Sequence, residues 1–225
     1  MKKLLAAIIA AALLLSGCSL SSRPAVSAPP AETPSPSPTP IVTPTPAPEP
    51  SDDELVLVRD YIPGIFIDLK YATTDNFTGQ VIYDSDEAYL RYGTVKKLLA
   101  AQNELSGRGL SLKIWDAYRP VSAQFKLWEI CPNPVYVSDP NNGYSKHSRA
   151  NTVDITLVTS TGESIPMPSG FDDFTSLADR DYSDVSAEAA ENARLLESIM
   201  VENGFVPYSG EWWHYSDSVN YDVYG

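Results

Sequence analysis

Two histidines, His147 and His214, are the only imidazole groups in this chain of 225 residues, and each has a carboxylate nearby in the sequence. Asp154 follows His147 after a short turn, and Glu211 precedes His214. Two imidazoles and one carboxylate make a ligand set for a catalytic zinc ion, with the fourth position open for water. Structural histidines satisfied by hydrogen bonds are the alternative that these residue types leave open.

The stretch 211–215, Glu-Trp-Trp-His-Tyr, joins large aromatic side chains to two polar groups that are costly to bury without partners. A metal ion and a polar substrate would supply such partners, whereas a core strand needs only a hydrogen bond for its histidine. In an ideal strand Glu211 and His214 point to opposite faces, so we expect a twist or bulge near Gly210. Glu211 can then serve as the base for a metal-bound water, whose pKa zinc lowers toward about 7.

Arg119 and Asp154 complete this set of candidate residues. Asp154 interrupts the β-branched, apolar run 152–158, and a buried carboxylate needs a cation, either a basic side chain or a metal. Arg119 lies between a predicted strand and a predicted helix, where it can stabilise an oxyanion with its permanent charge. From its position alone, Arg119 can equally be a surface or carboxylate-paired arginine. Together these residues indicate metal-assisted hydrolysis of an amide.

Both strands and helices are needed to position these residues. Alternation of apolar residues and the turn signals predict strands at 55–58, 65–69, 109–115, 152–158, 205–208 and 212–216. The helical pattern predicts helices at 86–106, 120–130 and 186–203. Ser186 is the expected cap of the last helix, and Gly204 is its expected end.

The N-terminal residues have the composition of a processing signal followed by a tether. Residues 1–17 combine two lysines with an apolar run too short to span a membrane, which is typical of a secretory signal. The residues Leu-Ser-Gly-Cys at 15–18 resemble the lipobox of bacterial lipoproteins, so we expect lipid on Cys18 and an extracytoplasmic protein anchored to the cell membrane. An ordinary signal peptide that happens to contain a cysteine is the alternative. Residues 18–53 are rich in Pro, Ser and Thr and are predicted to be a disordered stalk, which leaves 54–225 as one globular domain.

The charge of the chain limits its partners. A net charge of −13 and a sequence pI near 4.4 argue against nucleic acid and against a polybasic membrane patch. With Cys18 acylated, Cys131 is the one remaining thiol and is interpreted as structural.

Five motifs in order give the domain a resemblance to a known family. They are Lys70-Tyr71-Ala72-Thr73, Asp75-Asn76-Phe77-Thr78-Gly79, Trp115-Asp116-Ala117-Tyr118-Arg119-Pro120, Ser145-x-His147-x6-Asp154 and Glu211-Trp212-Trp213-His214. The chain resembles the D-alanyl-D-alanine dipeptidases associated with vancomycin resistance, which are zinc peptidases of family M15. The resemblance implies an α+β fold with a small central antiparallel sheet flanked by helices, the Hedgehog/D,D-peptidase fold.

The resemblance also implies roles for individual residues. It implies one Zn²⁺ per domain, with these ligands: His147, Asp154 and His214. It implies that Glu211 is the general base and that Arg119 stabilises the transition state. The positions that line the dipeptide pocket in the family are matched by Ser145, Tyr71 and Asp172. Asp172 is the expected partner of the substrate ammonium, although Asp173 is adjacent.

Two departures from the family pattern lie beside the expected metal site. The family usually has glycine where this chain has Ala150, and alanine where it has Thr152. If the glycine serves a positive φ, Ala150 costs about 1 kcal/mol there. We interpret both departures as tolerated variation.

We therefore expect zinc-dependent hydrolysis of D-Ala-D-Ala, or a related D-amino-acid dipeptide, in the metabolism of cell-wall peptidoglycan. One alternative is a zinc D,D-carboxypeptidase that trims the terminal D-Ala from peptidoglycan stem peptides. Another is a non-catalytic lipoprotein that binds the cell wall, although Glu211 and Arg119 are both retained. A role in antibiotic resistance is not predicted, because removing cytoplasmic D-Ala-D-Ala is incompatible with export.

Overall fold

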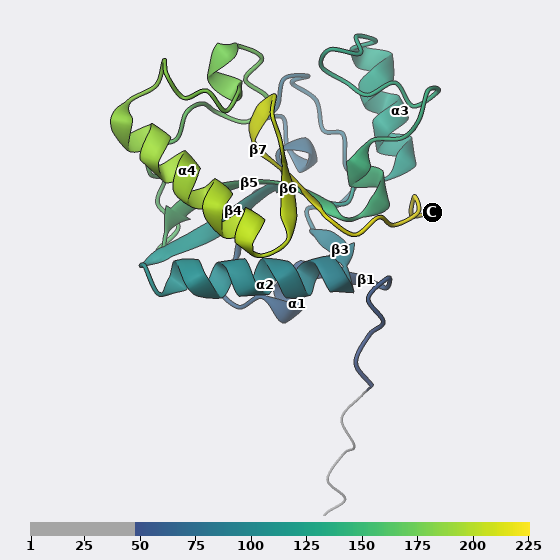
Figure 1. Ribbon diagram of the computed structural model, residues 1–225. Helices are drawn as coiled ribbons and strands as arrows, with labels where there is room; N and C mark the ends of the chain where they lie inside the picture. Colours follow the sequence, from purple (N-terminus) through teal and green to yellow (C-terminus); the bar gives the residue numbers. More distant parts are fainter. Residues whose placement is uncertain (1–47) are drawn as a thin grey trace, which may run out of the picture. The chain divides into compact units, whose positions relative to one another are not determined.

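The computed structural model describes residues 48–225, which form a mixed α+β domain (Figure 1). The expected signal segment 1–17, Cys18 and the stalk as far as residue 47 lie outside the described residues. The main sheet consists of β2 (Phe66–Ile67), β4 (Leu110–Asp116), β5 (Thr152–Thr159), β6 (Phe205–Tyr208) and β7 (Glu211–Asp217). A separate two-stranded ribbon pairs β1 (Leu55–Leu57) with β3 (Tyr89–Arg91).

The main sheet has the strand order β2-β4-β5-β7-β6. All of its neighbouring pairs are antiparallel except β2 and β4, which are parallel. The mainly antiparallel sheet agrees with expectation, and the parallel edge pair was not foreseen. β5 lies at the centre and is buried at every position except its last, as expected for a strand covered on both faces.

Within the described residues, four α-helices accompany the sheet: α1 (Val58–Tyr61), α2 (Tyr92–Ser106), α3 (Val121–Ile130) and α4 (Ala187–Glu202). α2 and α4 pack against each other and against the sheet, whereas α3 lies on the other side of the domain in Figure 1. Three short 3₁₀ turns complete the domain: η1 (Lys70–Ala72), η2 (Lys146–Arg149) and η3 (Ser176–Ala178). The core joins the inner faces of α2 and α4 to the sheet and includes these fully buried side chains: Leu98, Leu105, Leu112, Ile155, Leu196, Trp212 and Trp213.

Several predicted boundaries are corrected by the structure. The helix expected at 86–106 begins only at Tyr92, because residues 89–91 pair with β1 as a strand. The strand expected at 65–69 is reduced to two residues, and the strand expected at 55–58 ends at Leu57, where α1 follows. The helix expected at 186–203 is confirmed as α4, and the Ser186 side chain caps it by accepting from the amide of Ala189.

The residues before β1 also contact the domain. Although 48–53 was expected to belong to the stalk, the carboxylate of Asp52 lies 2.6 Å from the Lys96 ammonium of α2. The carbonyl of Asp52 accepts a hydrogen bond from Gly93 at 2.9 Å. Asp52, which lies just before the predicted domain start at 54, therefore packs against the domain. Within 48–225, no helix has the length and apolarity needed to cross a membrane.

Candidate active site

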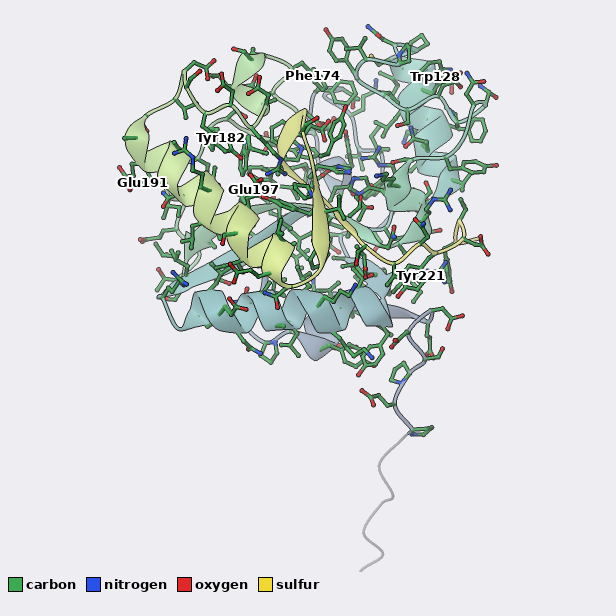
Figure 2. The ribbon with its side chains drawn as sticks, in the orientation of Figure 1. Trp128, Phe174, Tyr182, Glu191, Glu197 and Tyr221 are labelled. Atoms are coloured by element: carbon green, nitrogen blue, oxygen red, sulfur yellow. The ribbon has the colours of Figure 1, made fainter. Side chains whose placement is uncertain are left out.

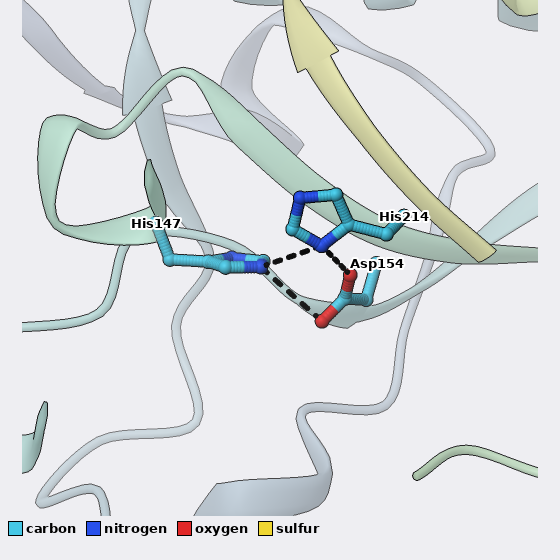
Figure 3. A group of neighbouring side chains, drawn as sticks. All are labelled: His147, Asp154 and His214. Carbon is cyan, nitrogen blue, oxygen red and sulfur yellow. Dashed lines mark hydrogen bonds and ion pairs between the residues drawn. The ribbon is translucent and has the colours of Figure 1, made fainter. Parts of the chain in front are cut away.

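His147, Asp154 and His214 come together in one cluster, and their candidate ligand atoms all lie within 4.8 Å of one another (Figure 3). Nε2 of His147 is 3.3 Å from Oδ2 of Asp154 and 3.4 Å from Nδ1 of His214. Nδ1 of His214 is 3.0 Å from Oδ1 of Asp154. The sequence therefore predicted correctly which residues meet here.

The sheet brings two of these residues together. Asp154 on β5 and His214 on β7 are directly opposed in the antiparallel register, so their side chains leave the same face of the sheet. His147 reaches them from η2, whose first turn is capped by Ser145. The Ser145 hydroxyl accepts a hydrogen bond from the backbone amide of His147 at 3.3 Å. The strand pair β5–β7 and the capped turn η2 thus bring the three candidate ligands together.

The chemistry of the cluster fits a divalent cation. Nδ1 of His147 lies 2.9 Å from the carbonyl oxygen of Ala117, a contact that places the ring proton on Nδ1. Nε2 then faces the cluster as a lone pair. Oδ1 of Asp154 is buried and accepts no hydrogen bond from the described residues, although Nδ1 of His214 is close. Buried acceptor atoms that face one another, here Nε2 of His147 and the carboxylate of Asp154, are stabilised by a cation between them. A site of two imidazoles and one carboxylate suits Zn²⁺.

The electrostatics keep Asp154 in its ionised form. Burial alone would raise the pKa of Asp154, but the adjacent His147 and His214 hold that pKa well below its usual range. Burial would lower the pKa of His147, and the carboxylates of Asp154 and Asp116 raise it. Asp154 is therefore ionised at neutral pH and provides the charge that a metal cation requires.

Glu211 lies beside the cluster at the start of β7. Its Oε2 is 3.4 Å from Nδ1 of His214, and about a third of its side chain is exposed. Burial, reinforced by the charge of Asp154, raises the pKa of Glu211 to about 7. A carboxyl group with this pKa can both accept and donate a proton near neutral pH.

An irregular β6–β7 pairing allows Glu211 and His214 to share one side. Pro207 pairs with Tyr215, but the next residue of β6, Tyr208, pairs with Glu211. Residues 212–214 therefore have no register partner on β6, which is the irregularity that the sequence required near Gly210. Trp212 and Trp213 are almost completely buried in this segment, in agreement with a packing role.

Arg119 is buried close to this cluster, and its guanidinium has a fixed orientation. Nη2 donates to Oδ2 of Asp116 at 2.6 Å, and Nη1 donates to Oε1 of Gln124 at 3.0 Å. The guanidinium also lies 5.1 Å from the centre of the Tyr71 ring. The carboxylate-paired arginine that the sequence left open is thus observed, and the pairing leaves Arg119 rigid and permanently charged.

Asp116 belongs to the motif Trp115-Asp116-Ala117-Tyr118-Arg119-Pro120, and its contacts add it to the candidate site residues. It is fully buried and accepts hydrogen bonds from Tyr83 and Arg119. Its Oδ2 also lies 3.6 Å from Nδ1 of His147, and in the sheet it pairs with Asp154. Its position as the last residue of β4, directly before the Ala-Tyr-Arg-Pro residues of this motif, was the available signal. Asp116 thus contacts both Arg119 and the candidate metal ligand His147.

Tyr71 and Asp172 form a second polar pair near Arg119. The Tyr71 hydroxyl donates to Oδ2 of Asp172 at 2.7 Å. Burial raises the pKa of Asp172 to about 7. Asp173 instead caps a local turn by accepting from the amide of Thr175, so the structure pairs Asp172, not Asp173, with Tyr71.

The two departures from the family pattern are both accommodated. Ala150 has φ 58° and ψ 28°, so this position does require the left-handed conformation that glycine adopts most easily. The hydroxyl of Thr152 is buried and donates to the hydroxyl of Ser216 at 3.0 Å. Neither substitution disturbs the approach of His147 to the other two candidate ligands.

Comparison with known proteins places this geometry in a wider context. Residues 51–222 match the Peptidase_M15 family, described as D-ala-D-ala dipeptidase. The D-alanyl-D-alanine dipeptidase of Escherichia coli (strain K12) is 40% identical over 162 residues, which cover 72% of this chain and 83% of that protein. The enzyme of the same name from Enterococcus faecium is 36% identical over 174 residues, covering 68% and 86% respectively. A solved structure of VanYB in complex with D-Alanine-D-Alanine aligns with a TM-score of 0.39 and 16% identity, covering 59% of this chain and 74% of that chain.

Proposed function

The chain belongs to the Peptidase_M15 family of D-Ala-D-Ala dipeptidases and is a metallopeptidase, and on this basis we propose that it hydrolyses D-Ala-D-Ala, or a closely related D-amino-acid dipeptide, with zinc. The observation that carries the proposal is the convergence of His147, Asp154 and His214 beside Glu211. A three-ligand site with an adjacent carboxylate that is not one of the ligands is the arrangement of a zinc hydrolase.

In the proposed mechanism His147, Asp154 and His214 would hold one Zn²⁺, which would supply a Lewis acid for the scissile carbonyl and for water. Glu211 accepts a proton from the attacking water and returns it to the nitrogen of the leaving D-Ala. Burial of Glu211 favours its protonated form and so assists the second transfer, whereas the adjacent cation would favour the carboxylate needed for the first. The exposed part of its side chain gives it access to water.

Arg119 and Asp172 provide the remaining charges of the proposed mechanism. The Arg119 guanidinium stabilises the negative charge that develops on the carbonyl oxygen during attack. Its ion pair with Asp116 and its bond to Gln124 fix it before the substrate arrives, so little reorganisation is needed. Ionised Asp172, held by Tyr71, binds the ammonium of the dipeptide.

A substrate panel tests this assignment against the carboxypeptidase alternative. The zinc-loaded protein is incubated with free D-Ala-D-Ala and with a stem peptide that ends in D-Ala-D-Ala, and released D-Ala is measured. A dipeptidase that binds the free ammonium through Asp172 should cleave the first substrate much faster. Cleavage of the stem peptide with the free dipeptide left intact would instead assign a D,D-carboxypeptidase.

We further propose that the enzyme works outside the cytoplasm, anchored by lipid on Cys18 and acting in peptidoglycan metabolism. The support is the arrangement of basic, apolar and small residues in 1–18 and the Pro-rich composition that follows. When a bacterial host is grown with a labelled fatty acid, the label should appear on the wild-type protein and not on Cys18→Ser. Absence of the label from the wild type would contradict the lipid anchor.

A further inference from the structure

Arg180 lies between η3 and α4, and its guanidinium contacts the β6–β7 hairpin, which carries both Glu211 and His214. Nη2 donates to the carbonyl oxygen of Glu211 at 3.0 Å and to that of His214 at 3.2 Å. Nε donates to the carbonyl oxygen of Tyr208 at 2.7 Å. One side chain therefore holds three backbone carbonyls of the hairpin.

The hairpin is irregular at the point where Arg180 binds. The β6–β7 register shifts between Pro207 and Tyr208, and Pro207 has no backbone N–H to contribute to the ladder. A bulged segment with fewer ladder bonds is free to vary in conformation unless other donors fix it. The planar guanidinium offers five donors in a fixed arrangement, which suits several carbonyls that face one point.

Arg180 is itself held in place from two directions. Its Nη1 lies 3.0 Å from Oε2 of Glu197 on α4 and 3.1 Å from the hydroxyl of Tyr215 on β7. The guanidinium lies 4.6 Å from the centre of the Tyr215 ring, and only 11% of the side chain is exposed. Glu197 also accepts a hydrogen bond from Tyr182, and Figure 2 labels both residues on the α4 side of the domain. Because the guanidinium is itself fixed and nearly buried, its hydrogen bonds restrain the three backbone carbonyls of the hairpin.

We propose that Arg180 is a positioning residue that sets the geometry between His214 and Glu211 by holding their carbonyls with one guanidinium. The roles of those two residues as metal ligand and base rest on the proposed function. Arg180 touches neither the metal site nor the substrate pocket through its side chain, so its effect is exerted through the backbone of β7. Loss of the guanidinium should release the bulge and misalign the ligand and the base together.

The test compares Arg180→Lys with Arg194→Lys. Lysine keeps the positive charge but cannot bind the carbonyls of Tyr208, Glu211 and His214 together. Arg194 is the matched control, because it places its guanidinium 5.5 Å from the Tyr182 ring on the same side of the domain. Zinc affinity is measured by competition with a chelator, and kcat and KM are measured with D-Ala-D-Ala.

For Arg180→Lys we expect the zinc dissociation constant to rise and kcat to fall, each roughly 10- to 100-fold, which is typical when residues that orient ligands are replaced. KM should change less, and Arg194→Lys should match the wild type. Glu197→Gln, which loosens Arg180 without altering the hairpin, should act in the same direction more weakly. This variant decides the question if Arg180→Lys does not fold.

Wild-type zinc affinity and kcat in folded Arg180→Lys would overturn the inference, even if its melting temperature fell, because Arg180 would then be structural only. If Arg180→Lys does not fold, wild-type values in Glu197→Gln would overturn it. A wild-type protein that binds zinc without hydrolysing D-Ala-D-Ala would instead refute the proposed function. In that case the zinc affinities alone would still decide the role of Arg180.

Discussion

Asp154 and His214 are directly opposed on β5 and β7, with Oδ1 of the aspartate 3.0 Å from Nδ1 of the histidine. Because that oxygen accepts no hydrogen bond from the described residues, the pair is arranged to share a cation. The sheet register therefore builds two thirds of the candidate metal site before His147 is added.

Zinc should stabilise the protein through Asp154. A ligand at about 100 times its dissociation constant adds about 2.7 kcal/mol to the free energy of unfolding, which corresponds to a rise in Tm of about 5–10 °C for a domain of this size. Asp154→Asn should abolish most of this rise, whereas Asp173→Asn, which affects only a turn, should retain it. Calorimetry with zinc and then with a chelator measures the effect. An equal rise in Asp154→Asn would contradict the ligand assignment.

Replacement of Arg119 by lysine should lower kcat more than it raises KM. Lysine cannot bind Asp116 and Gln124 simultaneously with the geometry of the guanidinium, so the charge loses its fixed direction. Removal of one preorganised oxyanion donor lowers kcat by roughly 10²- to 10³-fold. Steady-state kinetics on D-Ala-D-Ala check this, with exposed Arg59→Lys as the control. A change confined to KM would assign Arg119 to substrate binding instead.

Removal of the Tyr71 hydroxyl should change the pH at which kcat/KM rises. Burial raises the pKa of Asp172, while the hydrogen bond from Tyr71 favours the ionised form and lowers it. Ionised Asp172 is needed to bind the substrate ammonium, so kcat/KM should rise with pH as Asp172 loses its proton. Tyr71→Phe removes the stabilising bond, and the acidic limb of the profile should therefore move to higher pH. A shift to lower pH, or none, would contradict the proposed role of this pair.

Ala150→Gly should stabilise the protein slightly. The left-handed conformation costs an L-residue about 1–2 kcal/mol, whereas loss of the fully buried methyl group costs about 0.8 kcal/mol. The net gain is therefore up to about 1 kcal/mol, to be measured by urea denaturation. Zinc affinity should be unchanged, because the backbone conformation that positions His147 is already adopted. A loss of stability would mean that the methyl group matters more than the backbone strain.

Much of the candidate site was predictable from sequence because its residues are rare or out of place in their surroundings. The chain has only two histidines, and Asp154 interrupts an apolar strand, so both features stand out. The family resemblance is confirmed over most of the chain. The need for a bulge between Glu211 and His214 followed from strand geometry alone, and the structure contains it.

Other parts depend on contacts between distant residues that no local pattern reveals. Residues 89–91 were assigned to a helix, since their pairing with β1 depends on a segment more than 30 positions earlier. Arg180 gave no signal, because it lies in an acidic loop and binds carbonyls 28 to 34 positions later. Its role depends on the hairpin register and on Glu197, both of which are set by the tertiary structure.

The central claim is that one zinc ion, held by His147, Asp154 and His214, and the base Glu211 together hydrolyse D-Ala-D-Ala. The most direct test is release of D-Ala by the zinc-loaded wild type and by zinc-loaded Glu211→Gln, with zinc content measured in both. Glutamine keeps the size of the side chain but cannot accept a proton, so both proteins should bind zinc and only the wild type should turn over at an enzymatic rate. Equal rates in the two proteins would contradict the account.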